Sequence, residues 1–410
     1  MKKVGIITYY YHSNNYGGNL QSYALASYIN KLSGFKAEQI CFDFLNSQKQ
    51  YNSDSIGICP NQNKNTMSKK TIIFIRKIYF FLGKLVSLTT YKRAVIKFLN
   101  IINSKKFNLR ECAILRFNTD LIPHSSVVYT SSNISKCNDT YDIFITGSDQ
   151  VWSVPSNEFL LGFVDKKNKV SYAASIARTD ITESHRLFIK DKIKLFNSIS
   201  VRDNSDKDIV SKLTDLPVEV VLDPVFLLEK KEWDTISGRN RFSDVKYVFC
   251  YFLGECKEYN KIIKKFAKKN NLKIVIVPNF KNNENSTTFS DLFFGNYKPY
   301  DISPSDFLTL IREAEYVFTD SFHALAFSLI YNKNFFVIDR ISKWGNMNSR
   351  IINLLEKVGL SDRFCNNKDN KNIEYISRMR PINYSKINII LEKEKQKSCN
   401  FLKNSLYGSR

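Results

Sequence analysis

The sequence lacks the cysteine arrangements and the long apolar runs that mark several common classes of protein. Its eight cysteines form no Cys-x-x-Cys pair and no cluster with histidine, so we expect free thiols and no structural zinc site. No apolar run reaches the roughly 20 residues that span a bilayer. The best attempt, residues 71–88, is interrupted by Arg76, Lys77 and Lys84. Because the first residues also enter a strand pattern without a secretory signal, we expect a soluble cytoplasmic protein.

The sequence contains enough apolar residues for two folded domains, and it carries a large excess of positive charge. Hydrophobic residues make up 43% of the 410 residues and aromatic residues 14%, which is typical of a globular protein and excludes a disordered one. The formal net charge is +22. The lysines are diffuse and no nucleic-acid-binding module is recognisable, so we expect no nucleic-acid partner.

One stretch is more strongly basic than the rest. No acidic residue occurs between Asp54 and Glu111, while twelve lysines and arginines alternate there with apolar residues at helical spacing. This pattern predicts a basic helical insertion over about residues 64–117. Such helices either pack their apolar side on the protein core or lie on an anionic membrane surface, and the sequence leaves both open.

Alternating strand and helix patterns predict an α/β fold with two Rossmann-like domains facing a cleft. We expect an N-terminal domain over residues 1–228, a C-terminal domain over 244–378 and a charged helical tail over 379–410, with its helix over 387–402 at the edge. Residues 229–243 read as a polar connection, and the Asn-rich residues 279–296 as a mobile loop. The predicted strands cover residues 4–10, 37–44, 141–146, 169–176, 218–224, 247–253, 273–277, 314–318 and 335–339. The predicted helices cover residues 20–32, 182–196, 259–270, 303–313 and 349–358.

Polar residues gather repeatedly just after the predicted strands of the N-terminal half. In open α/β sheets, ligand sites form beyond the carboxyl ends of the strands, so this repetition favours an enzyme. Gly17 and Gly18 let the loop after the first strand bring its N–H groups close to a ligand, although they form neither a GxGxxG fingerprint nor a P-loop. The polar residues in question are Asn14, Asn15, Ser148, Asp149, Gln150, Arg202, Asp203 and Asp223.

The segment Thr-Asp-Ser-Phe-His-Ala (319–324) combines a helix start with a titratable side chain. It lies between an apolar strand pattern and a helical pattern, so Thr319, Asp320 and Ser321 are candidate N-caps and His323 falls in the first turn. Free N–H groups and the helix dipole attract a phosphate or carboxylate there, and the histidine can donate a proton. The alternative, equally open from these residues alone, is a capped helix whose histidine only packs.

Seven motifs occur in an order that resembles the polysaccharide pyruvyl transferase family. The resemblance covers most of residues 1–365 apart from the basic insertion. It implies a two-domain, glycosyltransferase-B-like enzyme that transfers pyruvate from phosphoenolpyruvate onto sugar hydroxyls, usually as a cyclic ketal, during cell-surface polysaccharide assembly. The motifs are Asn-Asn-Tyr-Gly-Gly-Asn-Leu-Gln (14–21), Gly-Ser-Asp-Gln-Val-Trp (147–152), Ser-Tyr-Ala-Ala-Ser (171–175), Ser-Val-Arg-Asp (200–203), Val-Leu-Asp-Pro (221–224), Thr-Asp-Ser-Phe-His (319–323) and Asn-Ser-Arg (348–350).

The resemblance assigns Arg202 to the carboxylate or phosphate of the donor, with pairing to Asp203 or Asp206 as the alternative. It places His323 as the proton donor or the phosphate ligand. Gly17, Gly18 and Ser321 are also expected to take part in donor binding. Asp320 either orients His323 or only caps its helix.

One position departs from the family pattern. Many members have an arginine where this chain has Ser321, so a donor contact is missing unless another cation replaces it. Arg350 is the preferred substitute, ahead of Arg340 and Lys343. The alternative is that Arg350 is a helix-surface residue.

The acceptor side has weaker candidates, each with a structural alternative. Asp149 and Gln150 either accept hydrogen bonds from sugar hydroxyls or organise their loop. Trp152 either stacks on a sugar ring or belongs to the core. The cleft floor is expected to include Asn14, Asn15 and Tyr16.

The implied partners are a glycan or lipid-linked oligosaccharide acceptor and, at most, a peripheral contact with the anionic inner membrane surface. We expect no cofactor and no metal, with phosphoenolpyruvate as donor substrate; the oligomeric state stays open. Two other functions remain: a glycosyltransferase that uses a nucleotide sugar, and a non-catalytic membrane-associated scaffold whose activity depends on the basic stretch instead of His323.

Overall fold

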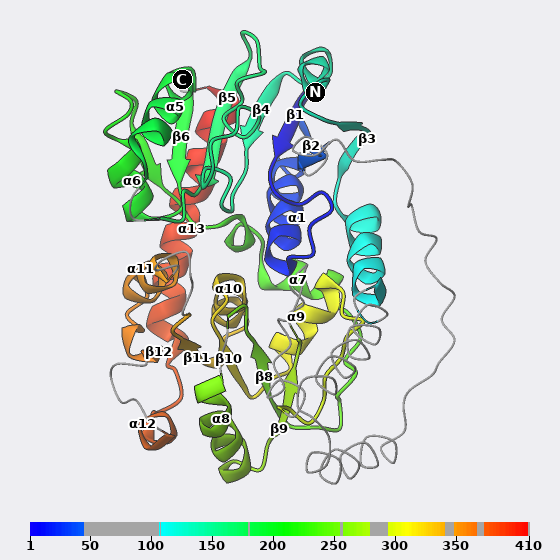
Figure 1. Cartoon of the computed structure of the whole chain (residues 1–410), viewed down its shortest axis with the longest axis vertical. Helices are drawn as coiled ribbons and strands as arrows, with labels where there is room; N and C mark the ends of the chain where they lie inside the picture. Colours follow the sequence, from blue (N-terminus) through cyan, green and yellow to red (C-terminus); the bar gives the residue numbers. More distant parts are fainter. Residues whose placement is uncertain are drawn as a thin grey trace, which may run out of the picture.

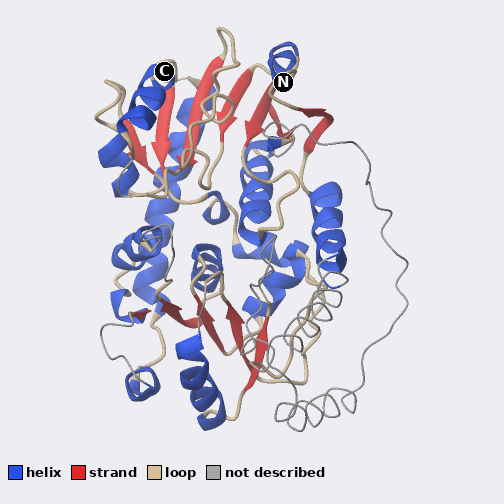
Figure 2. Ribbon diagram, in the orientation of Figure 1, coloured by secondary structure: helices blue, strands red, loops and turns tan. Residues whose placement is uncertain are grey.

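The structure, a computed structural model, contains two parallel β-sheets, one in each half of the chain (Figure 1). It describes residues 1–44, 106, 108–178, 181–254, 257–278, 294–340, 348–366 and 373–408. Most of the predicted basic insertion, most of the Asn-rich loop and Lys343 lie outside these ranges. Figure 2 shows the two sheets as separate layers with helices between and around them.

The N-terminal half is built on a seven-stranded sheet in the order β3-β2-β1-β4-β5-β6-β7, with every pairing parallel. The direction of winding reverses between β1 and β4, which is where ligands bind in sheets of this kind. The strands are β1 (Lys2–Ile7), β2 (Phe35–Phe42), β3 (His124–Tyr129), β4 (Ile143–Thr146), β5 (Asn168–Ala174), β6 (Ser198–Val201) and β7 (Val218–Val220). The helical segments are α1 (Tyr16–Asn30), η1 (Ile134–Asp139), α5 (Glu183–Ile193), α6 (Asn204–Val210) and η2 (Pro224–Phe226).

The C-terminal half has a five-stranded parallel sheet in the order β12-β11-β10-β8-β9. Strand β8 is a fully buried apolar run and β11 is buried after its first residue, as expected for a sheet covered on both faces. The strands are β8 (Tyr247–Tyr251), β9 (Lys273–Ile276), β10 (Tyr316–Thr319), β11 (Asn334–Ile338) and β12 (Phe364–Cys365). The helices are α8 (Lys257–Lys269), α9 (Pro304–Arg312), α10 (Phe322–Ile330), α11 (Ser349–Lys357), η3 (Ser361–Arg363) and α12 (Ile373–Arg378).

Two predicted boundaries differ in ways that affect the functional site. Helix α1 begins at Tyr16, four residues before the predicted start, because the side chain of Asn15 accepts a hydrogen bond from the N–H of Gly17 and caps the helix. The strand predicted over 218–224 ends at Val220, since Asp223 caps the short 3₁₀ segment η2. Both corrections place backbone N–H groups and polar side chains at the edge of the sheet.

The two halves share one hydrophobic core. Tyr16, at the start of α1, stacks on Phe307 of α9 at 4.8 Å and donates a hydrogen bond to the carbonyl of Ile302. Trp233, on α7 (Lys230–Ile236) in the predicted connection, is fully buried and packs against Phe327 of α10. These contacts fix the position of one sheet relative to the other.

Helix α13 (Tyr384–Tyr407) is longer than predicted, and it contacts both halves instead of lying at an edge. The hydroxyl of Tyr384, at its start, lies near the carbonyl of Ser328 in the C-terminal half. The hydroxyl of Ser398, further along, accepts a hydrogen bond from the N–H of Leu222 in the N-terminal half. Apolar periodicity understates this helix, because serine and cysteine form part of its buried face.

The described end of the basic stretch is a helix over residues 108–121 that packs on the protein. Ile114 and Phe117 are buried in the shared core, and Arg110 donates hydrogen bonds to the carbonyls of Pro278 and Tyr300 in the other half. For this part of the predicted insertion, the first of the two alternatives, packing of the apolar side on the protein core, is therefore correct.

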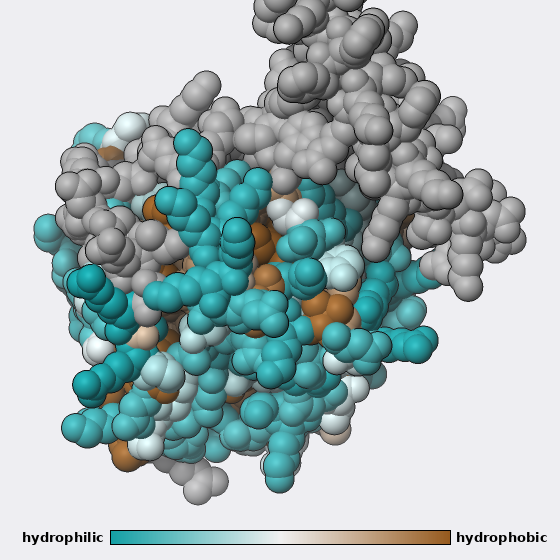
Figure 3. All heavy atoms as spheres, turned by 90° about the horizontal axis from the view of Figure 1, so that it is seen from below, coloured by the Kyte–Doolittle hydropathy of each residue, from teal (hydrophilic) through white to brown (hydrophobic). Residues whose placement is uncertain are grey.

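The C-terminal half presents a mostly hydrophilic face, with apolar side chains scattered among polar ones (Figure 3). Lys261, Lys264, Lys265 and Lys268 of α8 are exposed, whereas Ile263 and Phe266 of the same helix are buried. Diffuse positive charge of this kind is expected of a solvated surface. Among the described residues, no helix is both long and apolar enough to cross a membrane.

Replacing Trp233 by alanine should lower the free energy of unfolding by about 3 to 5 kcal/mol, because it empties a fully buried position between the halves. Urea denaturation followed by circular dichroism measures this change. The matched control is Leu195→Ala, at a side chain that is 54% exposed, where we expect a change within about 0.5 kcal/mol. Equal effects of the two substitutions would contradict the role of Trp233 at the interface.

Candidate functional site

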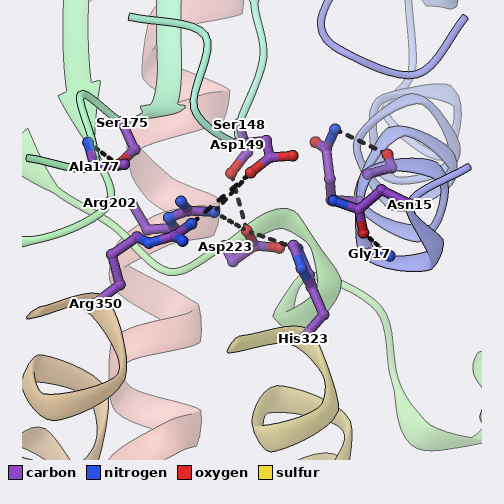
Figure 4. A network of polar contacts seen from close by, with 12 residues as sticks. Asn15, Gly17, Ser148, Asp149, Ser175, Ala177, Arg202, Asp223, His323 and Arg350 are labelled. Carbon is purple, nitrogen blue, oxygen red and sulfur yellow. Dashed lines mark hydrogen bonds and ion pairs between the residues drawn. The ribbon is translucent and has the colours of Figure 1, made fainter. Parts of the chain in front are cut away.

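The carboxyl ends of the strands in the two sheets face each other, and the polar residues that follow them meet between the halves (Figure 4). Asp149 follows β4, and Arg202 and Asp223 follow β6 and β7 in the N-terminal half. His323 follows β10 and Arg350 follows β11 in the C-terminal half. The site is therefore assembled from both halves of the chain.

Asp223 lies at the centre of this group. Its Oδ2 accepts hydrogen bonds from Ser148 Oγ at 2.9 Å and Arg202 Nη1 at 3.1 Å, and it lies 3.6 Å from His323 Nε2. Its Oδ1 accepts from the N–H of Val225. Burial alone would raise the pKa of Asp223, but His323 and Arg202 outweigh it and hold that pKa far below the usual range. Asp223 is thus an ionised, fully buried carboxylate.

The assignment of Asp320 as the residue that orients His323 is wrong, because Asp223 occupies that place. The carboxylate of Asp320 accepts hydrogen bonds from the N–H groups of Leu253 and Gly254, both at 2.7 Å. Burial raises the pKa of Asp320, although Arg340 and these N–H groups oppose the shift. Asp320 therefore fixes the loop after β8 and leaves the imidazole to its partner from the other half.

His323 lies against the first turn of α1. A Cβ atom added to Gly17 would come within 1.9 Å of His323 Nδ1, so only glycine allows this approach. The imidazole is nearly buried, with Nδ1 facing Gly17 and Nε2 facing Asp223. Ser321 caps α10 by accepting a hydrogen bond from the N–H of Ala324 and is itself buried, so its hydroxyl supports the helix start that presents His323.

Two buried arginines converge on the same point. Arg202 and Arg350 are each 6% exposed, and both guanidinium groups lie over the ring of Phe322, at 4.8 Å and 5.9 Å. Arg350 Nη1 and Arg202 Nη1 each lie 3.9 Å from Asp149 Oδ1. Arg350 is therefore not a helix-surface residue, and Arg202 pairs with Asp223 in place of Asp203 or Asp206. The carboxylate of Asp203 instead caps α6 through the N–H of Asp206.

The pKa values of the two arginines move in opposite directions. Burial and the charge of Arg202 lower the pKa of Arg350 to about 10. Burial also acts to lower the pKa of Arg202, but Asp223, Asp149 and Asp203 outweigh it and raise that pKa. The Nε and Nη2 groups of Arg202 are buried, and no described residue forms a hydrogen bond with either of them. Unpaired buried donors of this kind are costly, and an anion would satisfy them.

A cavity opens beside the arginine pair. Arg202 and Arg350 line it together with Lys357, which also forms an ion pair with Glu394 of α13. Much of the remaining wall is apolar. This wall includes Val220, Leu222, Phe226, Phe322 and Leu354. The cavity therefore combines three cations and an apolar wall with the carboxylates of Asp203 and Asp223.

Several predicted acceptor residues have structural roles. Trp152 is fully buried and donates its indole N–H to the carbonyl of Phe159, so its assignment to the acceptor is wrong and its alternative, a place in the core, is correct. Tyr16 is buried in the interface between the halves and cannot contact an acceptor. Asn14 donates to Glu111 of the helix over 108–121.

The other candidates lie close to the site. Asn15 is exposed at the cap of α1, and Gln150 is half-buried beside Asp149. Gly18 lies beside Asp149, because an added Cβ would be 3.7 Å from Asp149 Oδ2. The sequence assigned no role to Asp223, Phe322 or Lys357, although Asp223 stands among the polar residues that follow the predicted strands and in the Val-Leu-Asp-Pro motif.

No three His, Cys, Asp or Glu side chains gather within the described ranges in a way that could hold a metal ion. The polar groups that the structure brings together there are cations, carboxylates and one imidazole.

Asp223→Asn should lower the free energy of unfolding by about 3 kcal/mol at pH 7, because it breaks a buried charge network. The pKa of Asp223 is lower in the folded protein than its unfolded value of about 3.9, so its stabilisation is complete above that value. The difference between wild type and variant should shrink as the pH falls below about 4. Urea denaturation between pH 7 and pH 3.5 measures it.

Asp320→Asn is the matched control, since the pKa of Asp320 is raised by burial. A carboxyl group whose pKa is raised by folding destabilises the protein as the pH rises through that pKa. The free energy of unfolding of wild type, relative to that of Asp320→Asn, should therefore increase as the pH falls. If the stability difference from wild type changed with pH in the same direction for both variants, the opposite pKa shifts of Asp223 and Asp320 would be contradicted.

Comparison with solved structures shows the fold. A Staphylococcus aureus structure described as an MnaA-UDP co-structure matches with a TM-score of 0.51 and 12% identity, covering 99% of this chain and 97% of that chain. The UDP-GlcNAc 2-epimerase from Methanocaldococcus jannaschii matches with a TM-score of 0.50 and 11% identity, covering 99% and 100%. The protein thus has the predicted glycosyltransferase-B-like α/β fold of two Rossmann-like halves.

Comparison with family models shows the relationship by sequence. No curated protein sequence matches the chain. The family model described as polysaccharide pyruvyl transferase matches residues 15–342, well over half of the chain. The match runs from the cap of α1 through the helix that carries His323. The chain therefore belongs to the polysaccharide pyruvyl transferase family, a family of enzymes.

Proposed function

We propose that this enzyme transfers pyruvate from phosphoenolpyruvate onto hydroxyl groups of a glycan, forming a ketal, in bacterial surface polysaccharide biosynthesis. The observation that carries the proposal is the buried pair Arg202 and Arg350 beside the Asp223–His323 contact. Arg202 offers two N–H groups that have no partner among the described residues. A donor with two anionic groups fits such a site.

Phosphoenolpyruvate matches the chemistry of the cavity. Its carboxylate and phosphate suit Arg202, Arg350 and Lys357, and its methylene group suits the apolar wall. Arg350 supplies the charge that many family members have at position 321. The pKa of Arg350 is lowered by burial and by Arg202, so a bound anion would stabilise its charged form.

The reaction needs one proton donor and a stabilised cationic intermediate. In this proposal protonated His323 gives its proton to the methylene carbon of the donor, and Asp223 stabilises the imidazolium beforehand. A sugar hydroxyl attacks the oxocarbenium-like centre, phosphate leaves, and a second hydroxyl closes the ketal. Of the two hydroxyl protons, one is balanced by the new methyl hydrogen and the other by protonation of phosphate. We expect no metal requirement.

The acceptor in this proposal is a glycan, free or lipid-linked, that approaches from the side of Asn15, Asp149 and Gln150. Asp149 and Gln150 accept hydrogen bonds from its hydroxyls. The net charge of +22 suits a peripheral contact with the anionic inner face of the cell membrane.

Isothermal titration calorimetry with phosphoenolpyruvate tests the donor. We expect saturable binding to wild type and binding weakened about 10- to 100-fold in Arg202→Ala, since a charge-assisted pair is lost. Arg202→Lys keeps the charge but loses the planar fork, and should fall in between. His323→Ala should bind the donor nearly as wild type does if the imidazole acts as the acid, and more weakly if it holds the phosphate.

The matched control is Arg116→Ala, at an exposed arginine that does not line the cavity. It should leave the affinity unchanged, and so should a chelator added to wild type. Binding of a nucleotide sugar without binding of phosphoenolpyruvate would contradict the proposal and support the glycosyltransferase alternative. Vesicle binding that is indifferent to donor and to His323→Ala, with no donor binding, would support a scaffold.

A further inference from the structure

Asp149 is the carboxylate at the site whose oxygens accept no hydrogen bond from the described residues. Asp223 is held by Ser148, Arg202 and the N–H of Val225. Asp149 differs, because its carboxylate makes only two longer ion-pair contacts. Its side chain is 12% exposed, so solvent reaches it while both arginines stay nearly buried.

The geometry of these two contacts is loose. Asp149 Oδ1 lies 3.9 Å from Arg202 Nη1 and 3.9 Å from Arg350 Nη1. Charge-assisted hydrogen bonds between guanidinium and carboxylate are about 2.7 to 2.9 Å long. One oxygen of Asp149 therefore faces both arginines and lies within hydrogen-bonding distance of neither.

The backbone explains why Asp149 comes no closer. Its φ of +74° lies in the left-handed region, and its carbonyl accepts a hydrogen bond from the N–H of Ser175 beyond β5. The loop is thereby fixed to the neighbouring strand, with Asp149 Oδ1 3.9 Å from both guanidinium groups. The left-handed conformation carries a cost that aspartate and asparagine tolerate better than most residues.

From these contacts we infer that Asp149 is the exchangeable counter-ion of the arginine pair. In the ligand-free enzyme it balances part of the charge of Arg202 and Arg350, while Asp223 remains the permanent partner of Arg202. A bound anionic group takes over the arginines at hydrogen-bonding distance and releases Asp149 towards the acceptor side. The inference rests on the proposed function for the identity of the donor, but the exchange itself applies to any small anion.

Asp149 therefore opposes donor binding, and its removal should strengthen it. We expect Asp149→Asn to bind phosphoenolpyruvate about tenfold more tightly than wild type, because one negative charge near both guanidinium groups disappears. Asparagine keeps the size of the side chain and tolerates the left-handed backbone. Asp149→Gly, which also relieves the backbone, is the second variant and should show the same gain.

The matched control is Asp203→Asn. Asp203 also contributes to the field at both arginines and lines the same cavity, and asparagine preserves its role as the cap of α6. If Asp149 is the exchangeable counter-ion, the increase in affinity for phosphoenolpyruvate should be clearly larger in Asp149→Asn than in Asp203→Asn. Equal increases in affinity would mean that any nearby negative charge has the same effect, and would overturn the inference.

Calorimetry with phosphoenolpyruvate and, separately, with inorganic phosphate distinguishes this inference from the proposed function. Tighter binding of both anions by the two Asp149 variants supports exchange. Tighter binding of phosphate alone, with no binding of phosphoenolpyruvate to any form, supports exchange and contradicts the proposed donor. Unchanged or weaker binding in both variants overturns exchange and leaves the donor proposal standing, provided that wild type binds phosphoenolpyruvate.

Thermal unfolding provides a second measurement on the same proteins. Ligand-free Asp149→Asn should unfold at a lower temperature than wild type, because two buried arginines lose a counter-ion. The rise in unfolding temperature at saturating phosphate should be larger for the variant than for wild type. An equal rise in both would contradict exchange.

Discussion

The contact of Asp223 with Arg202 and His323 is the interaction on which the site depends. A buried carboxylate is stable only when cations and hydrogen-bond donors surround it, and here they come from both halves of the chain. Ser148 and Val225 provide donors within the N-terminal half, whereas His323 comes from α10 in the other. The ionised state of Asp223 and the position of the imidazole are therefore two consequences of the same packing.

Packing between the halves has to be tight for this contact to form. Gly17 allows the first turn of α1 to touch His323, and Tyr16 next to it is buried against Phe307. Helix α13 joins the halves on another side, and Arg110 joins them through the carbonyls of Pro278 and Tyr300. A cavity lined by two buried arginines depends on such a framework, because water would otherwise solvate the guanidinium groups.

Much of the fold was predictable from local periodicity, and the motifs follow the strands, although β3, β12 and α7 were not predicted. The resemblance to the family, more than periodicity, placed Arg202, Arg350 and His323 together at the donor site. The role suggested for Asp320 was wrong, because adjacency in sequence suggested a partner for His323 while the true partner, Asp223, lies in the other half. The acceptor role suggested for Trp152 was wrong as well, because the polar residues that precede it in the sequence do not reveal that its ring is buried. Contacts across two sheets depend on packing that no local pattern contains.

The serine at position 321 changes where the positive charge of the site originates. Its hydroxyl caps α10, so the turn that carries His323 has a short polar side chain where many family members have an arginine. The second guanidinium comes from Arg350 on α11, and Phe322 lies between Ser321 and His323 with its ring beneath both arginines. The cationic part of the site is thereby shifted towards the cavity between α6 and α11. Asp223 contacts both Arg202, which would hold the proposed donor, and His323, which would protonate it, so the ionised carboxylate links the two parts of the site.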